Sequence, residues 1–468
     1  MFNFSIAGKG SKFRNVLRKF TRSRQAYEIM VKQSDFKIVM LMNKIIPPLR
    51  LLLFGFVFIF FCGCQGNNSN SAKDASYGKA TKELVDLVEK NPDLKALLIA
   101  SIEKAKQINP DTATNPVQSL DQLYAYASKA ETSVPWRLAR DKQRPSTYND
   151  IVMAFCAFYF TIDQPLPQLE GKGQFNNSVE YTEPFASWLT KFNRSWQEYL
   201  DSDSSWSERY YQTVLKDSSF GLQKGWYEDP SHWKTFNQFF ARQLSSPAAR
   251  PIASPGDNSV VTSFADAVPQ GVWGIDGNSN IVDEQGVGVK TASIKSIVKL
   301  IGDESQYKDS FANGTLTHSF LDVNDYHRYH FPISGTIKEA RIIQGINPTG
   351  GVLTWDKEEG RYKFDPSIAG WQMLETRGCV IVETDQYGLV ALLPIGMAAV
   401  GSVNLMDNVK PGTTINKGDM LGYFLFGGSD FIVLFQSKVQ FILDAPRADN
   451  GSYQHLLVGE RLGHLSKK

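Results

Sequence analysis

Apolar residues in the first half of the chain recur at steps of three and four, the spacing that lines one face of an α-helix. From about Thr81 two such runs follow one another, and Asn91-Pro92 separates them because proline begins helices but does not continue them. Residues 151–160 are apolar throughout and too short to cross a bilayer, which takes about 20 residues, so they predict a core helix. A stripe of large apolar side chains predicts another buried helix and consists of Phe185, Trp188, Leu189, Phe192, Trp196, Tyr199 and Leu200. We therefore predict a helical domain at residues 79–235.

After Pro230 the helical spacing gives way to short runs rich in β-branched and aromatic residues, separated by Gly, Pro and Asn. This alternation is typical of short strands joined by turns. Gly412–Gly422 carries a turn pattern between short apolar stretches, which favours a β-rich, sandwich-like core. We expect an α+β fold in which the helical domain precedes an antiparallel, β-rich domain at residues 236–468.

One stretch of that second domain, Phe424–Phe435, places two glycines and a serine between two apolar, aromatic-rich runs. The runs predict buried strands, and Gly427-Gly428 permits backbone conformations that a residue with a Cβ resists. Ser429 is then either part of an ordinary hairpin turn or a reactive group on a strained one. From this stretch alone, the hairpin turn is the simpler interpretation.

Composition and charge narrow the classes of function. A chain of 468 residues is long enough for two or more domains, and 42% hydrophobic residues describe an ordinary globular protein. The net charge of +2 gives no reason to expect a nucleic-acid partner. The cysteines form no CxxC or Cys/His cluster with zinc-ligand spacing, so we predict no metal site; they are Cys62, Cys64, Cys156 and Cys379.

The N-terminal region carries the pattern of a secretory signal. Lys44 and Arg50 precede an apolar run, residues 51–61, that is too short to span a membrane and is followed by small residues. Gly63-Cys64 resembles the end of a bacterial lipobox, and that resemblance implies cleavage before Cys64 and acylation of its thiol. The Asn- and Ser-rich residues that come next fit a flexible tether at 64–78.

These features predict a lipoprotein that is anchored in a membrane and faces the periplasm or the cell exterior. Residues 1–63 would be an N-terminal extension and signal peptide, and a start at Met40 or Met42 would give the signal an ordinary length. Two alternatives stay open: the apolar run is an uncleaved membrane anchor, or it is a buried helix.

Six short elements follow one another across roughly Thr235–Val439. They are Phe239–Arg242 (FFAR), Ala249–Ile252 (ARPI), Asp325–Pro332 (DYHRYHFP), Val400–Ser402 (VGS), Lys417–Gly422 (KGDMLG) and Gly427–Ser429 (GGS). In this order and spacing they resemble the phosphatidylserine decarboxylase family. Each element is weakly specific by itself, whereas six in the family's order are a strong signal. The helical domain is also similar, without sharp motifs, to the one that precedes this catalytic domain in fungal tryptophan decarboxylases.

The resemblance implies that the chain makes its own cofactor. The Ser429 hydroxyl would attack the Gly428 carbonyl and convert the peptide to an ester, and elimination would cut the chain between 428 and 429. A pyruvoyl group would remain in place of Ser429, on a small chain, 429–468, held non-covalently by the large one. By the same resemblance, His330 oriented by Asp266 would be the base that activates the weakly nucleophilic hydroxyl.

The pyruvoyl ketone would then form a Schiff base with a substrate amine and take up the electrons released when the carboxylate leaves as CO₂. The resemblance makes His327 the proton donor to the resulting carbanion, since a histidine can hold and release a proton near pH 7. Arg242 or Arg328 would contact an acidic substrate group or, as the simpler interpretation, form a structural ion pair.

Other interpretations of these residues are weaker. His327 and His330 could begin a metal site, but no third ligand follows at a suitable spacing, and packed structural histidines are a second alternative. Ser429 lacks the G-x-S-x-G pattern of hydrolase nucleophiles. No motif surrounds the other histidines considered, and they receive no role; they are His318, His455 and His464.

Two positions depart from the family's common pattern. Family members commonly carry SPxDG around the processing aspartate, whereas this chain has Ser263–Ala267 (SFADA). They also commonly carry Thr after the reactive serine, whereas this chain has Asp430. A carboxylate beside the scissile bond could slow maturation, change the substrate or repel an anionic lipid headgroup.

Three hypotheses follow for the function. The leading one is a pyruvoyl-dependent decarboxylase that converts phosphatidylserine to phosphatidylethanolamine at a membrane surface, held there by a lipidated Cys64. The second is a decarboxylase of a free, possibly aromatic, amino acid such as tryptophan. The third is a surface lipoprotein that keeps the fold as a binding module and does not cut itself.

Overall fold

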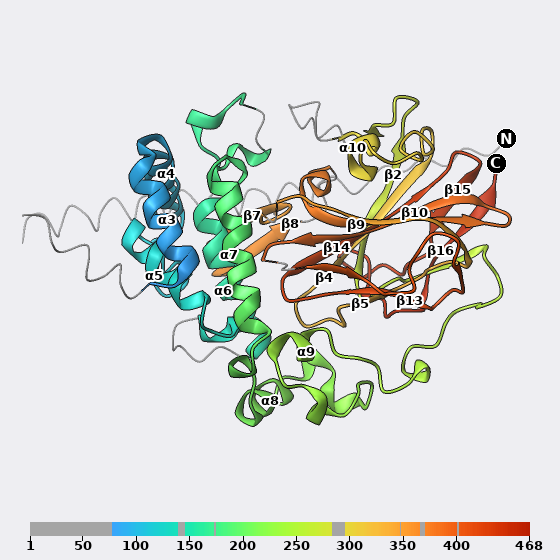
Figure 1. Ribbon diagram of the computed structural model, residues 1–468, viewed down its shortest axis with the longest axis horizontal. Coiled ribbons are helices and arrows are strands. Elements are labelled where there is room, and N and C mark those ends of the chain that lie inside the picture. The colour runs from blue at the N-terminus through green and yellow to red at the C-terminus, as the bar shows by residue number, and fades with distance from the viewer. Residues whose placement is uncertain are drawn as a thin grey trace, which may run out of the picture. The chain divides into compact units, whose positions relative to one another are not determined.

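Helices dominate the first half of the chain and strands the second, as shown in Figure 1. The computed structural model describes residues 77–138, 146–172, 175–282, 295–346, 348–365, 370–399 and 402–468. All of these residues fall within one compact unit. The α+β fold expected from the sequence is confirmed, while the proposed limits of the tether and of the two domains stay predictions.

Five of the eight α-helices in the described residues begin at a capping side chain. The eight are α3 (Lys79–Lys90), α4 (Pro92–Ile108), α5 (Leu120–Ala130), α6 (Thr147–Ile162), α7 (Phe185–Leu200), α8 (Glu208–Leu215), α9 (Phe236–Phe240) and α10 (Ile297–Ile301). Those with a capping side chain are α5, α6, α8, α9 and α10. The hydroxyls of Ser119, Ser146 and Ser207 each accept a hydrogen bond from a backbone N–H in the first turn of α5, α6 and α8. The predicted break at Asn91-Pro92 is confirmed, because α3 ends at Lys90 and α4 starts with the proline.

The predicted aromatic stripe of α7 lies in the core of the helical part. Trp188 and Phe192 stack with ring centroids 5.3 Å apart, and Trp196 continues the row. Each of these side chains is buried, which contributes about 1.5–3 kcal/mol per large apolar residue. In Figure 1, α6 and α7 lie between the α3–α5 group and the strands, and α6 contacts β7 (Val352–Asp356).

The strands form antiparallel sheets. They are β1 (Val260–Thr262), β2 (Val268–Ile275), β3 (Ile281–Val282), β4 (Thr315–Leu321), β5 (Arg328–His330), β6 (Gly335–Ile343), β7, β8 (Arg361–Asp365), β9 (Thr376–Thr384), β10 (Gly388–Met397), β11 (Val403–Leu405), β12 (Thr414–Ile415), β13 (Met420–Phe424), β14 (Gly428–Phe435), β15 (Val439–Leu443) and β16 (Arg461–Lys467). The largest sheet has eight strands in the order β12-β6-β9-β10-β14-β4-β2-β3. Smaller sheets contain β1-β16-β15, β11-β13-β5 and β7-β8.

Strand β14 lies in the interior of the large sheet, and its side chains pack into the apolar clusters on both faces of that sheet. It pairs antiparallel with β10 on one side and with β4 on the other, and all eight of its residues are buried. Because side chains alternate along a strand, Phe431 and Val433 enter one apolar cluster while Ile432 and Leu434 enter another. A strand held by two neighbours and two cores would stay in place if the chain were cut at its start.

The hairpin predicted around Gly427–Asp430 is wrong. Strand β13, which precedes these residues, pairs with β5 and β11 in a different sheet from β14. Only residues 425–427 connect the two strands, and Gly428, Ser429 and Asp430 already belong to β14. The second apolar run was predicted as a strand correctly, whereas in the first run only Phe424 belongs to a strand and Leu425 and Phe426 lie in the connection. Sequence spacing alone could not tell that β13 and β14 pair with different partners.

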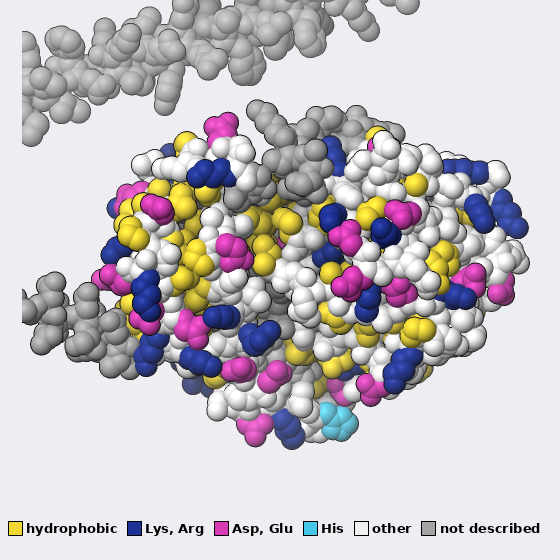
Figure 2. Space-filling view, turned by 45° about the horizontal axis from the view of Figure 1, so that its top comes forward, with side chains coloured by type: hydrophobic (Ala, Val, Ile, Leu, Met, Phe, Trp, Pro, Cys, Tyr) yellow, Lys and Arg dark blue, Asp and Glu magenta, His cyan; other side chains and the backbone are white. Residues whose placement is uncertain are grey.

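The predicted signal, Cys64 and nearly all of the predicted tether lie outside the residues that the structure describes. Within the described part of the chain, no helix combines the length and apolar character needed to cross a membrane. Basic and acidic side chains are interspersed over the face drawn in Figure 2, in keeping with the small net charge.

Candidate active site

Ser429 lies at the buried start of β14, between two neighbouring strands. It is opposite Gly396 of β10 and Leu321 of β4. Its side chain is fully buried, and its Oγ has no hydrogen-bond partner among the described residues. Buried hydroxyls normally find a partner, and Ser178 and Ser319 are exceptions as well, so Ser429 is distinguished by its position directly after Gly428.

The backbone around the predicted scissile bond is tightly held. The Gly428 N–H donates to the Ala398 carbonyl at 2.9 Å. A Cβ on Gly428 would lie 3.1 Å from Met397 Cγ, so a side chain would crowd the neighbouring strand end. Ala398 and Ala399, which face this point, have φ values of 32° and 62°, in the left-handed region that residues with a Cβ avoid. Strained backbone of this kind tends to collect at functional sites.

His330, the predicted base, is buried on β5 with both ring nitrogens occupied. Nδ1 donates to the Gly418 carbonyl at 2.8 Å, which leaves Nε2 as the acceptor for the Tyr326 hydroxyl at 3.2 Å. Burial lowers the pKa of His330 below its ordinary value. The imidazole is therefore neutral near pH 7, the form that a general base requires, and its Nε2 lone pair accepts from Tyr326 in this structure.

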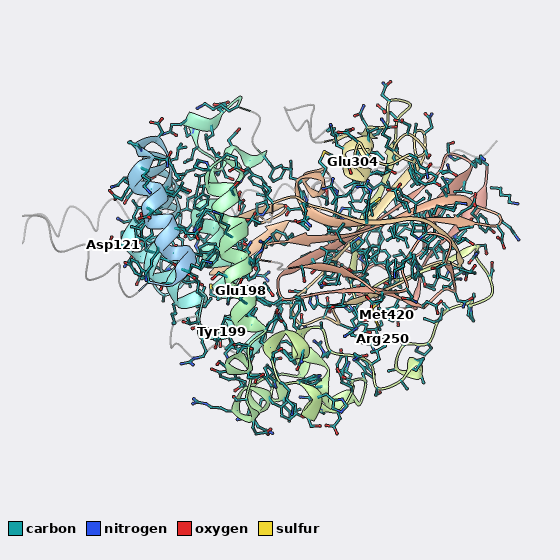
Figure 3. The ribbon with its side chains drawn as sticks, in the orientation of Figure 1. Asp121, Glu198, Tyr199, Arg250, Glu304 and Met420 are labelled. Carbon is teal, nitrogen blue, oxygen red and sulfur yellow. The ribbon has the colours of Figure 1, made fainter. Side chains whose placement is uncertain are left out.

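Asp266, the residue predicted to orient His330, bonds to a different partner. Its two carboxylate oxygens accept from Nε and Nη2 of Arg250 at 3.0 and 2.6 Å, and Oδ1 also accepts from the Val458 N–H. The structure contains no hydrogen bond between Asp266 and His330. Asp266 acts on His330 through its charge instead, which opposes part of the lowering of the pKa of His330 by burial. Arg250, which is labelled in Figure 3, belongs to the ARPI element but received no role from the sequence.

His327, the predicted proton donor, is fully buried. Its Nε2 donates to the Asp322 carbonyl at 3.0 Å, its ring stacks on Phe240 at 3.9 Å, and its Nδ1 has no partner among the described residues. Burial, helped by the positive charge of Arg242, lowers the pKa of His327 to about 3. This differs from the expectation of a histidine that titrates near pH 7: before any reaction the ring is neutral, with its one proton on Nε2.

The two arginines of the motifs hold backbone rather than carboxylates. Nη2 of Arg242 donates to the carbonyls of Asn324 and Asp325 at 2.8 and 2.9 Å, just before His327. Nε of Arg328 donates to the Ala241 carbonyl at 2.7 Å. The structural role expected for them fits these contacts, but the ion pairs expected with it are not formed with any described carboxylate.

Asp430 points to the opposite face of the sheet from Ser429, as strand alternation requires. It is fully buried and lies 3.2 Å from Nδ1 of His318, and its Oδ2 accepts from Nε2 of Gln372 at 3.2 Å. His318 stacks on Trp273 with ring centroids 4.6 Å apart. The carboxylate is therefore adjacent to the scissile bond in sequence but bound in a separate polar cluster.

A cavity of about 230 Å³ opens beside Asp266, between the helical part and the strands. Its lining includes Lys224, Trp226, Asp325 and His455. Nε2 of His455 lies 2.8 Å from Oδ1 of Asp325. No group of three or more His, Cys, Asp or Glu residues is arranged to hold a metal ion within the described ranges.

Comparison with known proteins places this arrangement in a family. Residues 236–464 match the family model described as phosphatidylserine decarboxylase. A phosphatidylserine decarboxylase proenzyme of Chlamydia felis is 30% identical over 261 residues, which cover 55% of this chain and 79% of that protein. The chain therefore belongs to the phosphatidylserine decarboxylase family, a family of carboxy-lyases, and the resemblance read from the six sequence elements is confirmed.

Two further relatives show the range of the family. Phosphatidylserine decarboxylase proenzyme 2 of rice is 32% identical over 249 residues, covering 50% of this chain and 35% of that protein. Decarboxylase iboD of Amanita muscaria is 27% identical over 251 residues, covering 50% of this chain and 69% of that protein. The chain thus spans about a third of the rice relative and only 22% of a Komagataella relative.

Proposed function

We propose that this chain is a self-processing, pyruvoyl-dependent decarboxylase. The observation that carries the proposal is the placement of Ser429: a buried hydroxyl without a partner, directly after a glycine, in a chain of the phosphatidylserine decarboxylase family. Asp266, His327 and His330, on other elements of the same domain, supply the remaining groups that the family's chemistry requires.

The first stage is an exchange of bonds within the chain. Once the Tyr326 hydroxyl has released it, His330 Nε2 would take the proton of the Ser429 hydroxyl while Oγ bonds to the Gly428 carbonyl carbon. The Ser429 nitrogen would then leave and take up that proton from His330. The ester is then cleaved by elimination: Cα of residue 429 loses its proton, the Cβ–Oγ bond breaks, and Gly428 becomes a free carboxylate. Water hydrolyses the resulting enamine with release of ammonia, which leaves a ketone at the new N-terminus.

The residues present fit a pyruvoyl group at position 429. The Ser429 hydroxyl makes no hydrogen bond that would have to be broken, and Gly428 presents its carbonyl without a side chain. This group supplies the electron sink for decarboxylation. Strand β14 remains held between β10 and β4, so the small chain 429–468 would stay bound without a covalent link.

His327 would act as a neutral proton carrier. Because its pKa is about 3, the ring carries one proton, on Nε2, which forms a hydrogen bond to the Asp322 backbone carbonyl. The lone pair on Nδ1 has no partner among the described residues. The neutral ring would take at Nδ1 a proton that the substrate's ammonium group gives up, and return it to the carbanion that forms when CO₂ leaves, so that the same nitrogen both accepts and delivers the proton. Phe240 stacked on the ring keeps bulk water from the imidazole face.

The substrate we propose is phosphatidylserine, which would become phosphatidylethanolamine. Support comes from the family model and from the names of the bacterial and plant relatives. A free amino acid is a second candidate, favoured by the fungal decarboxylase among the relatives and by the complete burial of Ser429. CO₂ release from phosphatidylserine vesicles and from tryptophan, measured side by side, separates the two; turnover of the free amino acid alone would overturn the lipid proposal.

Intact mass analysis of the purified protein tests the self-processing. Two chains that meet between Gly428 and Ser429, the smaller lacking a free amino terminus, are expected. A single uncut chain would instead favour a binding module that keeps the fold without its chemistry.

We also propose that acylated Cys64 holds the enzyme at a membrane facing the periplasm or cell exterior, where a lipid substrate is at hand. The lipobox-like Gly63-Cys64 supports this proposal. Cys64→Ser should release the protein from the membrane fraction and leave chain cleavage unchanged. Membrane retention of that variant would contradict the anchor.

A further inference from the structure

Phe426, two residues before Gly428, has both of its backbone groups bonded to side-chain amides. Its N–H donates to Oδ1 of Asn237 at 3.1 Å, and its carbonyl accepts from Nε2 of Gln197 at 2.7 Å. Phe426 itself is fully buried against aromatic rings that include Trp196 and Phe240. The two amides thus take the place that a neighbouring strand would occupy beside this residue.

The two amides also fix one another. Nδ2 of Asn237 donates to Oε1 of Gln197 at 2.9 Å and to Oδ1 of Asp201 at 2.9 Å. Both side chains are buried, with 5% of Gln197 and 2% of Asn237 exposed. Each amide oxygen therefore accepts and each amide nitrogen donates, so neither group can rotate by half a turn without losing bonds.

Gln197 also reaches the opposite side of the scissile segment. Its Nε2 donates a second hydrogen bond, to the Ala399 carbonyl at 3.0 Å. Ala399 follows Ala398, whose carbonyl accepts from the Gly428 N–H at 2.9 Å. The amide NH₂ group of Gln197 thus bonds both to Phe426, just before the predicted scissile bond, and to Ala399, in the strained segment that faces that bond.

These contacts come from the helical part of the chain. Gln197 lies on α7, before the residues matched by the family model, and Asn237 lies on α9 at the start of that match. Figure 3 labels Glu198 and Tyr199, the next residues of α7, at the end of this helix toward α9. The family's chemistry is therefore assembled here with a side chain from outside the family's own domain.

We propose that Gln197 and Asn237 are positioning residues for self-cleavage, which rests on the processing proposed above. They hold Phe426 and Ala399 so that the Gly428 carbonyl carbon stays within reach of the Ser429 hydroxyl. A displacement of about 1 Å can cost a factor of about 100 in rate when an attack depends on fixed geometry. The helical domain is then part of the maturation machinery as well as a cover for the site.

The test follows precursor conversion after a synthesis pulse in a cell-free system, below the unfolding temperature of every variant. Gln197→Met keeps the volume but removes both donors, and Gln197→Glu keeps the acceptor for Asn237 while it places a carboxylate against two carbonyls. Both should slow cleavage at least about 10-fold. Gln164→Met is the matched control, because Gln164 is an equally buried amide that donates to Phe160 and should leave the rate within about twofold.

A double variant separates positioning from general destabilisation. If Gln197 and Asn237 act through the same hydrogen-bonded unit, Gln197→Met with Asn237→Leu should slow cleavage little more than the slower single variant. Hydroxylamine, which cleaves an ester far faster than a peptide bond, should release less product cut between Gly428 and Ser429 from the Gln197 variants than from the wild type. A merely structural role would lower the unfolding temperature and leave that fraction unchanged.

Failure of this inference and failure of the proposed function have different signatures. A folded Gln197→Met protein that cleaves at the wild-type rate overturns the positioning role while self-processing stands. A wild-type chain that stays uncut, like Ser429→Ala, removes the self-processing and the positioning role with it.

Discussion

The two faces of β14 differ, at its first residues, in whether the buried polar side chain has a hydrogen-bond partner. On one face, the Ser429 hydroxyl is buried without a partner among the described residues. On the other face, the Asp430 carboxylate lies within hydrogen-bonding range of His318 and Gln372, although Nε2 of His318 has no partner among the described residues. The side chain of Ser429 thus has no hydrogen-bond partner within the described part of the chain, whereas the side chain of Asp430, the next residue of the strand, has partners.

This difference in hydrogen bonding indicates that Ser429 is kept reactive and that Asp430 is not. A buried group without a partner costs about 1–3 kcal/mol, and such a cost is retained where function needs the group free. A buried carboxylate bound by a histidine and an amide gains its stabilisation from those bonds, and is held away from chemistry. Asp430, the residue that departs from the family's pattern, is on this evidence a structural substitution with its own partners, on the face away from Ser429.

The strongest test of this comparison removes the unpaired hydroxyl. Ser429→Ala should leave one full-length chain, with less than about 1% cleaved, because no other group can form the ester. Intact mass measures the outcome. Ser319→Ala is a close control: Ser319 lies on β4 opposite Phe431, is buried on the same face and also has an unpaired Oγ, yet should cleave normally. Cleavage in Ser429→Ala, or its loss in Ser319→Ala, would show that hydroxyl identity does not decide the reaction.

Removing the carboxylate on the bonded face should affect stability rather than chemistry. In a Ser429→Ala background, which keeps one chain, Asp430→Ala should lower the free energy of unfolding by about 3 kcal/mol, because it leaves His318 buried without its partner. Urea denaturation measures the change.

A matched pair of variants sharpens the result. Asp430→Thr restores the residue common in the family, and combining it with His318→Phe, which removes the orphaned partner, should recover part of the loss. If Asp430→Ala instead abolishes cleavage in an otherwise wild-type chain that remains folded, the carboxylate belongs to the reactive face after all.

The neutral state of His327 makes a prediction about acid. Its pKa is about 3 when folded and about 6.5 when unfolded, so between these values the unfolded chain binds more protons. Stability from this residue is therefore present above pH 6.5 and is lost as the pH falls toward 3. From pH 7 to pH 5 the loss is about 2 kcal/mol.

The variant His327→Asn should lose less stability on acidification. In a Ser429→Ala background, its free energy of unfolding should fall less between pH 7 and pH 5 than that of the parent. Because Asp163 and Asp325, whose pKa values burial raises to about 6, titrate in the opposite sense, the difference between variant and parent is the quantity to compare. An equal drop in both proteins would mean that His327 is protonated near pH 6.5 in the fold.

Much of this architecture can be predicted from the sequence, because periodicity is a local property. The helix break at Pro92, the buried stripe of α7 and the strand character of residues 431–435 follow from spacing and composition alone. The reactive residues follow from six short elements in a family's order. Arg250 could have been added, since it belongs to one of those elements.

Long-range pairing is what the sequence does not contain. The partners of β13 and β14, the bond of Asp266 to Arg250 instead of His330, and the neutral His327 depend on packing between distant segments. His318 and Gln197 have no local motif, and only the fold brings them to Asp430 and Phe426. The shift of a histidine pKa by burial likewise requires knowing what surrounds it.

The smallest expected effect concerns a link between α6 and His327. The Tyr148 hydroxyl donates to Oδ2 of Asp322 at 2.6 Å, and the Asp322 carbonyl in turn holds Nε2 of His327. Tyr148→Phe should cost about 1.5 kcal/mol of stability, typical of a lost hydrogen bond to a charged group, and slow decarboxylation a few-fold by loosening His327. Chain cleavage should be unchanged, since this path reaches His327 and not Ser429. A cleavage rate that falls with the decarboxylation rate would show instead that the helices support the whole site as one body, and that the site cannot be divided into a cutting part and a proton-carrying part.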